Sequence, residues 1–306
     1  MPYTKSIFNK YALVLGILPA VFFYLLMGLG PSIATAVFSF TDISGVANTP
    51  WKFIGLENYK EFFFKENTRD LLQIVRNTIW FCLAVTFLQN AVALPVALAL
   101  NSRIIRAKNF FRAVIFFPVV LGVLVTSLVW MCVLNPMDGP VQKLLEVFGA
   151  SSGFFTDKSA ALNCVIFTQI WMYMGYSMII NLAGLQTIPS ELYEAGDMDG
   201  ASRLQGFRFI TFPMLWPTIS ANILLAIIGS LQSFQIIIIA TSPNSIPSQT
   251  LASRAMYYAF NIGQTDAARS AMRQGYGAAW TMILFVFILA ATLMYKRTMD
   301  RKELEI

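Results

Sequence analysis

The chain has 306 residues, of which 57% are hydrophobic and only 12% are charged, whereas a soluble domain carries roughly a quarter charged residues. This composition is that of an integral membrane protein. The net charge of +6 is too small and too scattered for a nucleic-acid surface, and the absence of histidine removes the commonest general base and metal ligand, so we expect no nucleic-acid partner, no metal and no catalytic site.

Charge-free apolar windows predict the membrane spans along the chain. Each window holds the roughly 20 residues that cross a hydrocarbon core, and a helix is required there because backbone groups in lipid must be paired internally. The far end of the fifth window, 242–247, is polar and turn-forming, so that window holds one span. The sequence thus predicts a single all-α transmembrane domain over residues 1–306 with six helices. The expected spans cover about 12–38, 77–100, 113–134, 161–184, 215–240 and 275–295.

Basic residues predict the orientation. Six spans place the N-terminus, the 101–112 segment, the long loop before the fifth span and the C-terminal tail on one face of the membrane. Lysine and arginine favour the cytoplasmic face, which predicts that both termini are cytoplasmic. The basic residues of the two termini and of the 101–112 segment are Lys5, Lys10, Arg103, Arg106, Lys108, Arg112, Lys296, Arg297, Arg301 and Lys302.

A charge-bearing loop over about 187–213 separates the fourth and fifth spans. Gly200 and Gly206 interrupt its helical pattern, and Pro213 marks the entry into the next apolar run. We expect two short helices bent near Gly200 that are presented to a partner protein, and the alternative is an ordinary solvated connector. Small residues lie beside its acidic residues, which are Glu191, Glu194, Asp197 and Asp199.

This loop resembles the "EAA" coupling loop of ABC importer permeases. The pattern of that loop is matched, in order, by Glu194, Ala195, Asp199, Gly200, Ala201, Phe207, Ile210 and Pro213. The chain departs from the pattern at Gly196, where an alanine is usual, and at Phe212, where a leucine is common. The likeness covers nearly the whole chain and is closest to the carbohydrate-uptake branch typified by maltose and glycerol-phosphate importers, at 53–59, 76–78 and 185–193.

The resemblance implies the permease subunit of a binding-protein-dependent ABC importer in the bacterial inner membrane. Its implied partners are a second, related permease subunit, a pair of ATP-binding cassette ATPase subunits and an extracytoplasmic solute-binding protein. The chain contains no G-x-x-x-x-G-K-[ST] phosphate loop, so we expect no cofactor of its own and ATP bound only by the ATPase. The resemblance implies that the following residues of this chain dock on the ATPase: Glu191, Glu194, Ala195, Asp199, Gly200, Ala201, Phe207 and Pro213.

Neutral polar and aromatic side chains in the fourth and fifth spans are the candidate substrate ligands. Amide hydrogen bonds combined with aromatic faces suit a neutral polyol such as a sugar, and the resemblance places the sugar cavity between these two helices. Helical spacing puts Gln169, Tyr173 and Tyr176 on one face. Each residue could instead serve a hydrogen bond between helices. The full candidate set is Gln169, Tyr173, Tyr176, Gln232, Ser233 and Gln235.

The predicted function is uptake of a sugar or oligosaccharide, driven by ATP hydrolysed on a separate subunit. A permease for a non-sugar solute such as a glycerol-phosphate ester stays open, although a phosphate favours a cationic cavity and the spans contain no charged side chain. A secondary carrier or a channel is a weaker alternative, because carriers usually keep an ionisable relay within the membrane.

Overall fold

The computed structural model describes residues 16–46, 48–102, 105–242, 245–261 and 272–303, with side chains up to Met299. The first four residues of the expected 12–38 span therefore lie outside the described residues, as do Lys5, Lys10 and Arg103, which entered the orientation argument. The chain divides into two compact units, one of Met1–Lys65 with Tyr257–Met282 and one of Glu66–Met256 with Ile283–Ile306.

Within the described residues all regular secondary structure is helical, apart from one isolated antiparallel bridge between Thr41 and Phe53. Five helices there are long and apolar enough to span a membrane, and a sixth candidate is a pair of helices bent by 100°. The expected all-helical membrane architecture is confirmed, while the exact number of spans and their orientation stay predictions. The five helices are Gly16–Phe38, Thr68–Asn101, Ala161–Gln186, Arg203–Gln232 and Gln274–Met299, and the bent pair is Lys108–Val120 with Val123–Val133.

In the first unit, the last part of the first apolar helix is α2 (Gly30–Phe38). A short helix is hydrogen-bonded to the end of α2. The short helix α3 (Glu57–Lys60) continues into a π-helical turn at Glu61–Lys65. Asn58 in α3 is buried, and its Nδ2 donates hydrogen bonds to the carbonyl oxygens of Ser39 at 2.9 Å and Thr41 at 2.8 Å. These bonds satisfy carbonyls at the end of α2 that have no partner within that helix.

An aromatic cluster and an ion pair complete this unit. The ring centroids of Phe62 and Trp280 lie 4.6 Å apart with the planes nearly perpendicular, a favourable edge-to-face contact. Arg273 donates two hydrogen bonds of 2.8 Å to the carboxylate of Glu61. Burial by itself lowers the pKa of Arg273, but the hydrogen bonds and charge of Glu61 outweigh that effect and raise its pKa above the usual range.

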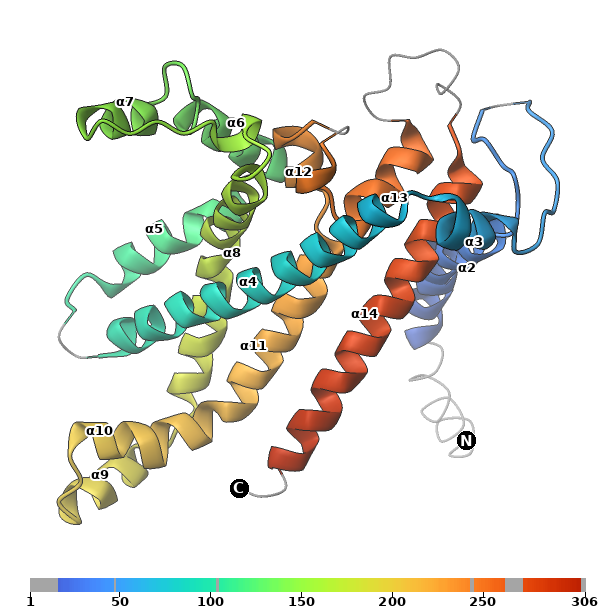
Figure 1. Cartoon of the computed structure of the whole chain (residues 1–306). Helices are drawn as coiled ribbons and strands as arrows, with labels where there is room; N and C mark the ends of the chain where they lie inside the picture. The colour runs from blue at the N-terminus through green and yellow to red at the C-terminus, as the bar shows by residue number, and fades with distance from the viewer. Residues whose placement is uncertain (1–15, 47, 103–104, 243–244, 262–271, 304–306) are drawn as a thin grey trace, which may run out of the picture. The chain divides into compact units, whose positions relative to one another are not determined.

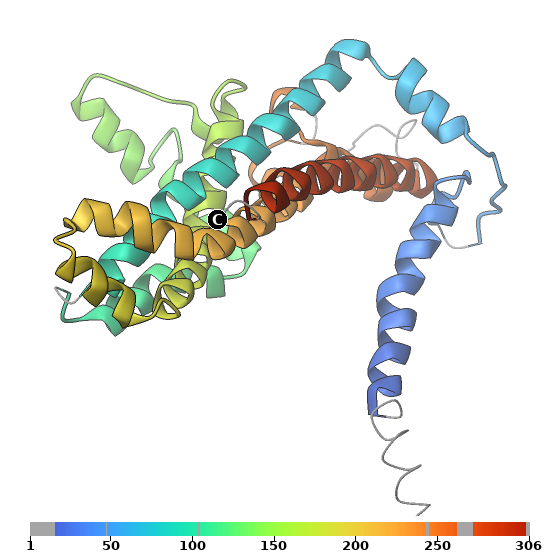
Figure 2. The same cartoon turned by 90° about the horizontal axis from the view of Figure 1, so that it is seen from below.

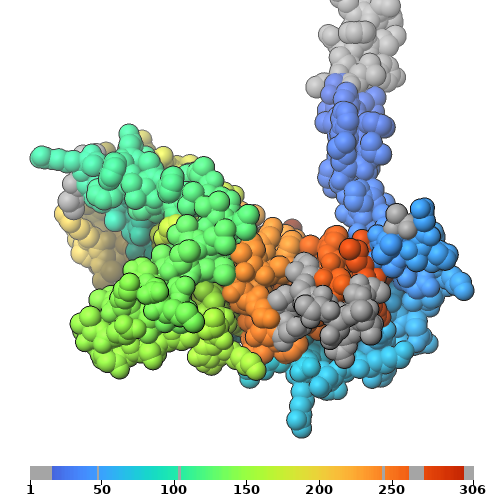
Figure 3. Space-filling model, turned by 90° about the horizontal axis from the view of Figure 1, so that it is seen from above, coloured from blue at the N-terminus to red at the C-terminus, as the bar shows by residue number. Residues whose placement is uncertain are grey.

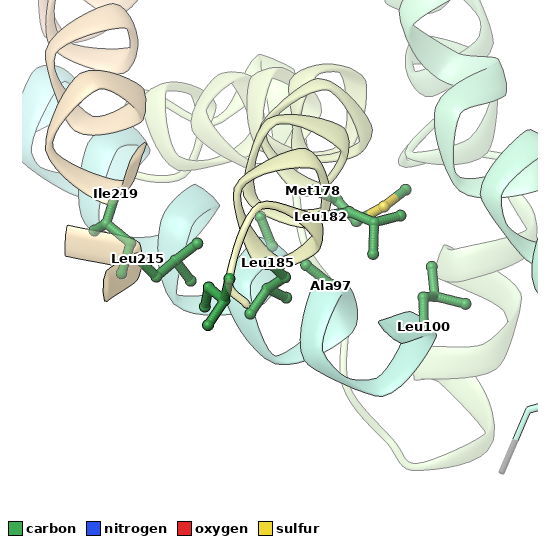
Figure 4. Packing of buried hydrophobic residues seen from close by; sticks show 9 residues of the cluster. Ala97, Leu100, Met178, Leu182, Leu185, Leu215 and Ile219 are labelled. Carbon is green, nitrogen blue, oxygen red and sulfur yellow. The ribbon is translucent and has the colours of Figure 1, made fainter. Parts of the chain in front are cut away.

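In the second unit, α4 (Thr68–Asn101), α8 (Ala161–Gln186) and α11 (Phe212–Gln232) lie side by side (Figure 1). Their facing sides form one buried apolar cluster, shown in Figure 4. In lipid, close van der Waals packing of this kind is a main source of helix association, because the hydrocarbon tails are as apolar as the side chains. The cluster consists of Ala93, Ala97 and Leu100 of α4, Met178, Leu182 and Leu185 of α8, Ile188, and Leu215 and Ile219 of α11.

Helix α4 starts nine residues before the expected span of 77–100. Asn67 caps it by accepting a hydrogen bond from the backbone nitrogen of Arg69 at 3.0 Å. With 34 residues the helix is about 50 Å long, more than the ~30 Å hydrocarbon core. Its charged first turns can therefore project out of the core, which a charge-free window cannot detect.

Asn77 and Thr78 fasten α4 to the segment before α13 (Leu251–Phe260). The Nδ2 atom of Asn77 is within hydrogen-bond distance of the carbonyl oxygens of Pro247 and Gln249, both at 2.9 Å. The hydroxyl of Thr78 accepts from the backbone nitrogen of Leu251 at 2.9 Å. The only helical turn in this segment is the short 3-10 turn Ile246–Ser248 among its described residues, and the two side chains supply partners for its buried backbone groups.

The expected continuous span over 113–134 is instead broken into α5 (Lys108–Val120) and α6 (Val123–Val133). Pro118 removes a backbone donor from the last turn of α5, and Leu121 and Gly122 both take extended conformations. On the other side of the break, α6 packs against α12 (Gln235–Ala240). Hydropathy correctly indicates that this stretch is apolar, but it carries no information about whether the helix is straight or bent.

The fifth expected span, 215–240, is also interrupted. The helix runs from Arg203 to Gln232, then Ser233 is extended and α12 begins at Gln235. No proline or glycine marks this break, so the residue pattern gives no local signal for it. By contrast, α8 at Ala161–Gln186 and α14 at Gln274–Glu303 contain the windows expected at 161–184 and 275–295.

Opposite ends of the second unit carry different elements. One end is formed by the 187–213 loop between α8 and α11, which contains helices α9 (Ser190–Met198) and α10 (Arg203–Gly206) (Figures 1 and 2). The other end carries α6, α12 and the amphipathic helix α7 (Pro140–Val147). Figure 3 views that end, where the green surface of α6 and α7 adjoins the orange surface of segment 235–256.

Candidate functional site

A cavity of about 610 Å³ opens among the helices of the second unit. It lies where α4, α5, α8 and α11 meet the break before α12, and none of its lining residues is charged. The wall contains both polar and apolar side chains. The lining residues are Val85, Gln89, Val119, Gln169, Tyr173, Tyr176, Ser177, Asn222, Leu225, Ala226, Gly229, Ser230, Gln232, Ser233, Phe234 and Gln235.

The six substrate-ligand candidates chosen from the sequence all lie on this wall. Gln169, Tyr173 and Tyr176 reach it from one face of α8, as their spacing indicates. Gln232, Ser233 and Gln235 reach it from the end of α11, the break and the first residue of α12. The structure therefore gathers the candidates around one space, and their contact with a substrate stays a prediction.

Two of the six also bond one helix to another. The hydroxyl of Ser233 donates to Oε1 of Gln169 at 3.1 Å, and both side chains are buried. This bond holds the break after α11 against α8. Within the described part of the chain, the side chains of Tyr173, Gln232 and Gln235 have no hydrogen-bond partner, so their polar groups are open to a ligand.

The cavity includes residues that the sequence argument left out of its candidate set. Gln89 of α4 and Val119 of α5 come from spans that were not considered for substrate, and Ser177 and Asn222 complete the polar wall. One signal could have found Ser177, because it lies four residues after Tyr173 on the same face of α8. Gln89 carries only a weaker signal, as an amide within an apolar window.

Ser177 joins three helices at this wall. Nε2 of Gln89 donates to the Ser177 hydroxyl at 2.6 Å, and Nδ2 of Asn222 donates to the Ser177 carbonyl oxygen at 3.1 Å. All three residues are buried. The polar wall is therefore held together by bonds among α4, α8 and α11, the same helices that form the apolar cluster.

The loop between α8 and α11 forms a compact turn of two short helices, as the sequence predicts. Gly200 closes α9 with φ of +74°, a conformation that a glycine adopts without steric cost. Ser202 then caps α10 in a reciprocal arrangement: its backbone nitrogen donates to Oε1 of Gln205 at 2.7 Å, and its hydroxyl accepts from the Gln205 nitrogen. Gly196 lies inside α9 without ending it, and its missing Cβ leaves room for Ile210.

The predicted docking residues divide by exposure. Glu191, Glu194, Ala195, Asp199 and Gly200 are exposed, whereas Ala201, Phe207 and Pro213 are half-buried. The ring of Phe207 lies 6.1 Å from that of Phe212, on the side of α11.

The same turn also carries exposed apolar side chains, which the sequence analysis did not identify as docking residues. Met198 is 84% exposed and Leu204 is 75% exposed, although both lie among charged residues. Apolar side chains this exposed beside unpaired charges are typical of a surface that meets another protein.

The sequence from residue 89 to residue 302 matches the family of binding-protein-dependent transport system inner membrane components. The chain belongs to this permease family. The match covers most of the chain, including the whole loop and every cavity-lining residue except Val85.

Individual relatives agree with that assignment. The permease is 31% identical to the "multiple sugar-binding transport system permease protein MsmF" of Streptococcus mutans, over 93% of both chains. It is 26% identical to the "trehalose/maltose transport system permease protein MalF" of Thermococcus litoralis, over 93% of this chain and 91% of that one. Its fold is that of a solved bacterial ABC transporter "involved in the import of the acidic polysaccharide alginate", with a TM-score of 0.80, 20% identity and coverage of 98% and 99%.

In this permease, the loop and the cavity are connected through packed side chains. Tyr193 of α9 and Ile210 pack against the apolar cluster of α4, α8 and α11. The hydroxyl groups of Tyr193 and Thr211 are 3.0 Å apart, which links α9 to the π-helical turn Phe207–Thr211 that leads into α11. The bonds of Ser177 lie on the same three helices at the cavity, so the turn and the cavity wall are parts of one packed assembly.

Proposed function

We propose that this permease carries an uncharged sugar or oligosaccharide through the inner membrane into the cytoplasm. The observation that carries the proposal is the chemistry of the 610 Å³ cavity, whose wall is rich in amides, hydroxyls and aromatic rings and contains no charged side chain. Such a wall offers donors and acceptors to hydroxyl groups and flat faces to sugar rings. The size falls within the range of small-molecule sites, about 300–1,000 Å³.

The absence of charge among the lining residues also limits the substrate. A carboxylate or phosphate moved into a membrane cavity without a cationic partner pays a large desolvation cost. The relatives MsmF and MalF are named for multiple sugars and for trehalose and maltose, which supports a sugar in this permease as well. A glycerol-phosphate ester would need its cation from another subunit.

Energy comes, in this proposal, from ATP bound and hydrolysed by a separate pair of ATPase subunits, and the permease itself has no nucleotide site. The turn formed by α9 and α10 docks on the ATPase: Glu194 provides charge, Ala195 and Gly200 allow close approach, and Met198 and Leu204 supply apolar contact. Six spans with both termini in the cytoplasm place this turn on the ATPase side. A second, related permease subunit completes the pathway, and a solute-binding protein delivers the substrate from outside.

The packed connection between turn and cavity suggests how ATP drives transport. When the ATPase pair closes, it displaces the docked turn. Tyr193 and Ile210 press on the apolar cluster, and close-packed side chains transmit the displacement because they cannot be compressed independently. Helices α4, α8 and α11 then move together and change the access of the cavity from one face of the membrane to the other.

Transport by the complete importer tests this function. The permease, its partner subunits and the binding protein are reconstituted in proteoliposomes, and ATP-dependent uptake is measured for uncharged sugars, a uronic acid oligosaccharide and glycerol phosphate. We expect saturable uptake of at least one uncharged sugar and none of the acidic compounds. Uptake of only an acidic compound would overturn the assignment, and uptake that continues without ATP would indicate a carrier or channel.

A further inference from the structure

We propose that Gln89 of α4 is a specificity-determining residue, which places one hydrogen-bonding amide against a substrate hydroxyl at the wall of the cavity. The inference rests on the proposed function, because it assumes that the cavity receives a hydroxylated substrate. It adds a ligand from the second span to a site that the sequence assigned to the fourth and fifth spans alone.

An amide at the position of Gln89 lowers the stability of the fold unless it is hydrogen-bonded. The side chain of Gln89 is only 5% exposed, in the middle of a 34-residue apolar helix. Val85, one turn earlier on the same face, also lines the cavity, so the orientation of α4 brings Gln89 to the open space rather than to lipid.

One end of the amide is fixed by the protein. Nε2 of Gln89 donates to the hydroxyl of Ser177 at 2.6 Å, and Ser177 has no exposed surface. The Ser177 carbonyl oxygen accepts from Asn222 of α11. Ser177 thus acts as a positioning residue, since it is itself held in place and sets the direction of the Gln89 amide.

The other end of the amide has unused capacity. A glutamine side chain offers two N–H donors and two acceptor lone pairs. Among the described residues, only the bond to Ser177 uses this capacity, and the carbonyl oxygen Oε1 has no partner there. A hydroxyl group of a sugar can donate to that oxygen, so binding would give it a hydrogen-bond partner.

The next residue along α4 provides a contrast. Nδ2 of Asn90 donates to the carbonyl oxygen of Thr86 in the same helix at 2.8 Å, and Asn90 does not line the cavity. Two adjacent amides on one helix therefore differ in position, and Asn90 supplies a matched control for any substitution at Gln89.

A fixed, partly satisfied amide gives selectivity for a particular hydroxyl. A site built to bond a hydroxyl discriminates strongly against an analogue without it, because the polar group of the site is then left unpaired. We therefore expect Gln89 to affect one hydroxyl position of the substrate and not the others.

The test compares the Gln89→Leu variant with the unmodified permease in the reconstituted complete importer. Uptake is measured for the transported sugar and for its monodeoxy analogues. Loss of one hydrogen bond should raise KM for the parent sugar about tenfold with kcat nearly unchanged. For one analogue, the one lacking the contacted hydroxyl, the two proteins should have the same KM. The Asn90→Ala permease should keep the KM values of the unmodified protein for every compound.

A purely structural role gives a different result. If Gln89→Leu raises KM by the same factor for the parent and for every analogue, or changes no KM, the inference is wrong. If Gln89→Leu does not assemble, the analogue series is measured with Ser177→Ala, which releases the amide without removing it and should weaken selection at the same hydroxyl. Failure of the unmodified importer to take up any uncharged sugar would refute the proposed function itself, and that outcome is separate from a uniform effect of Gln89→Leu.

Discussion

The cavity and the α9–α10 turn belong to the same unit of the permease and differ in almost every physical respect. The cavity is polar without charge, and several of its side chains are buried and bonded to one another. The turn carries four acidic residues, and within the described part of the chain none of them forms an ion pair. Exposed apolar side chains lie beside those acidic residues.

The difference reflects the medium that each region faces. Inside the membrane a lone charge is expensive, so ligand contacts there are best made by neutral amides, hydroxyls and rings. At the aqueous end, charge costs little and can select a complementary partner. Substitutions in the turn should therefore act on coupling to ATP, and substitutions in the cavity should act on the choice of substrate.

The largest effect should come from Gly200→Trp in the turn. The positive φ of 74° disfavours any side chain with a Cβ, by roughly 1–2 kcal/mol, and the indole would also block close approach of the ATPase. We expect uptake to be lost while the variant still inserts in the membrane. ATP-dependent uptake and the amount of ATPase that copurifies with the permease measure this effect.

Gly200→Asn is the matched control for that experiment, because asparagine tolerates the left-handed conformation and is small. It should retain most uptake. Full uptake by a well-inserted Gly200→Trp protein would show that this turn is not a docking surface.

Glu194→Lys should have the next largest effect. It reverses an exposed charge that the permease leaves without an ion pair in its described part, so the folded permease should keep its stability. Binding of the ATPase should weaken by tenfold or more, with loss of uptake, if the partner surface is basic. Copurification at low and high salt gives the measurement, and equal recovery of the ATPase with both proteins would contradict the assigned contact.

Replacing a predicted substrate ligand on the cavity wall should have an intermediate effect of a different kind. Tyr173→Ala or Gln232→Ala removes a side chain that lines the cavity and has no hydrogen-bond partner in the described residues. We expect KM to rise about tenfold, or the preference among sugars to change, with ATPase binding unaffected. Asn163→Ala on α8, outside the cavity, is the control. Unchanged kinetics for all tested sugars in both cavity variants would remove these residues from the site.

The smallest effect should follow Tyr193→Phe, which keeps the ring and deletes the hydroxyl facing Thr211. A single partly buried hydrogen bond contributes about 1 kcal/mol, so uptake should fall only a few-fold while ATPase binding persists. Thr211→Val should act similarly, and the double variant should be no worse than either single variant. Additive losses would mean that the two hydroxyls act independently of each other.

Much of this architecture could be predicted from residue order. The charge-free windows at 161–184 and 275–295 fall within helices of the structure, and Gly200 and Gly206 predict the bend of the turn. Both are local properties. Helical spacing also put Gln169, Tyr173 and Tyr176 on one face, because that relation depends only on the geometry of a single helix.

The breaks in the third and fifth spans and the position of Gln89 on the cavity wall were not predictable in this way. Pro118 and Gly122 permit a bend, but its 100° angle depends on how α5 packs on α8 and α6 packs on α12. Gly175 lets the backbone of Ile115 lie so close to α8 that a Cβ there would be 2.2 Å from its carbonyl oxygen. Such contacts join residues about 60 positions apart, and no local pattern reports them.

By itself the sequence determined that this chain is a helical membrane protein, where its apolar stretches lie and where a charged turn interrupts them, because hydropathy, charge and turn chemistry act over a few residues. Only the tertiary structure decided which faces of α4, α8 and α11 meet, and therefore that Gln89, Ser177 and Asn222 share one wall with the predicted ligands. In lipid that choice depends on close packing and on pairing of buried polar groups between helices, which are properties of the assembled bundle rather than of any one segment.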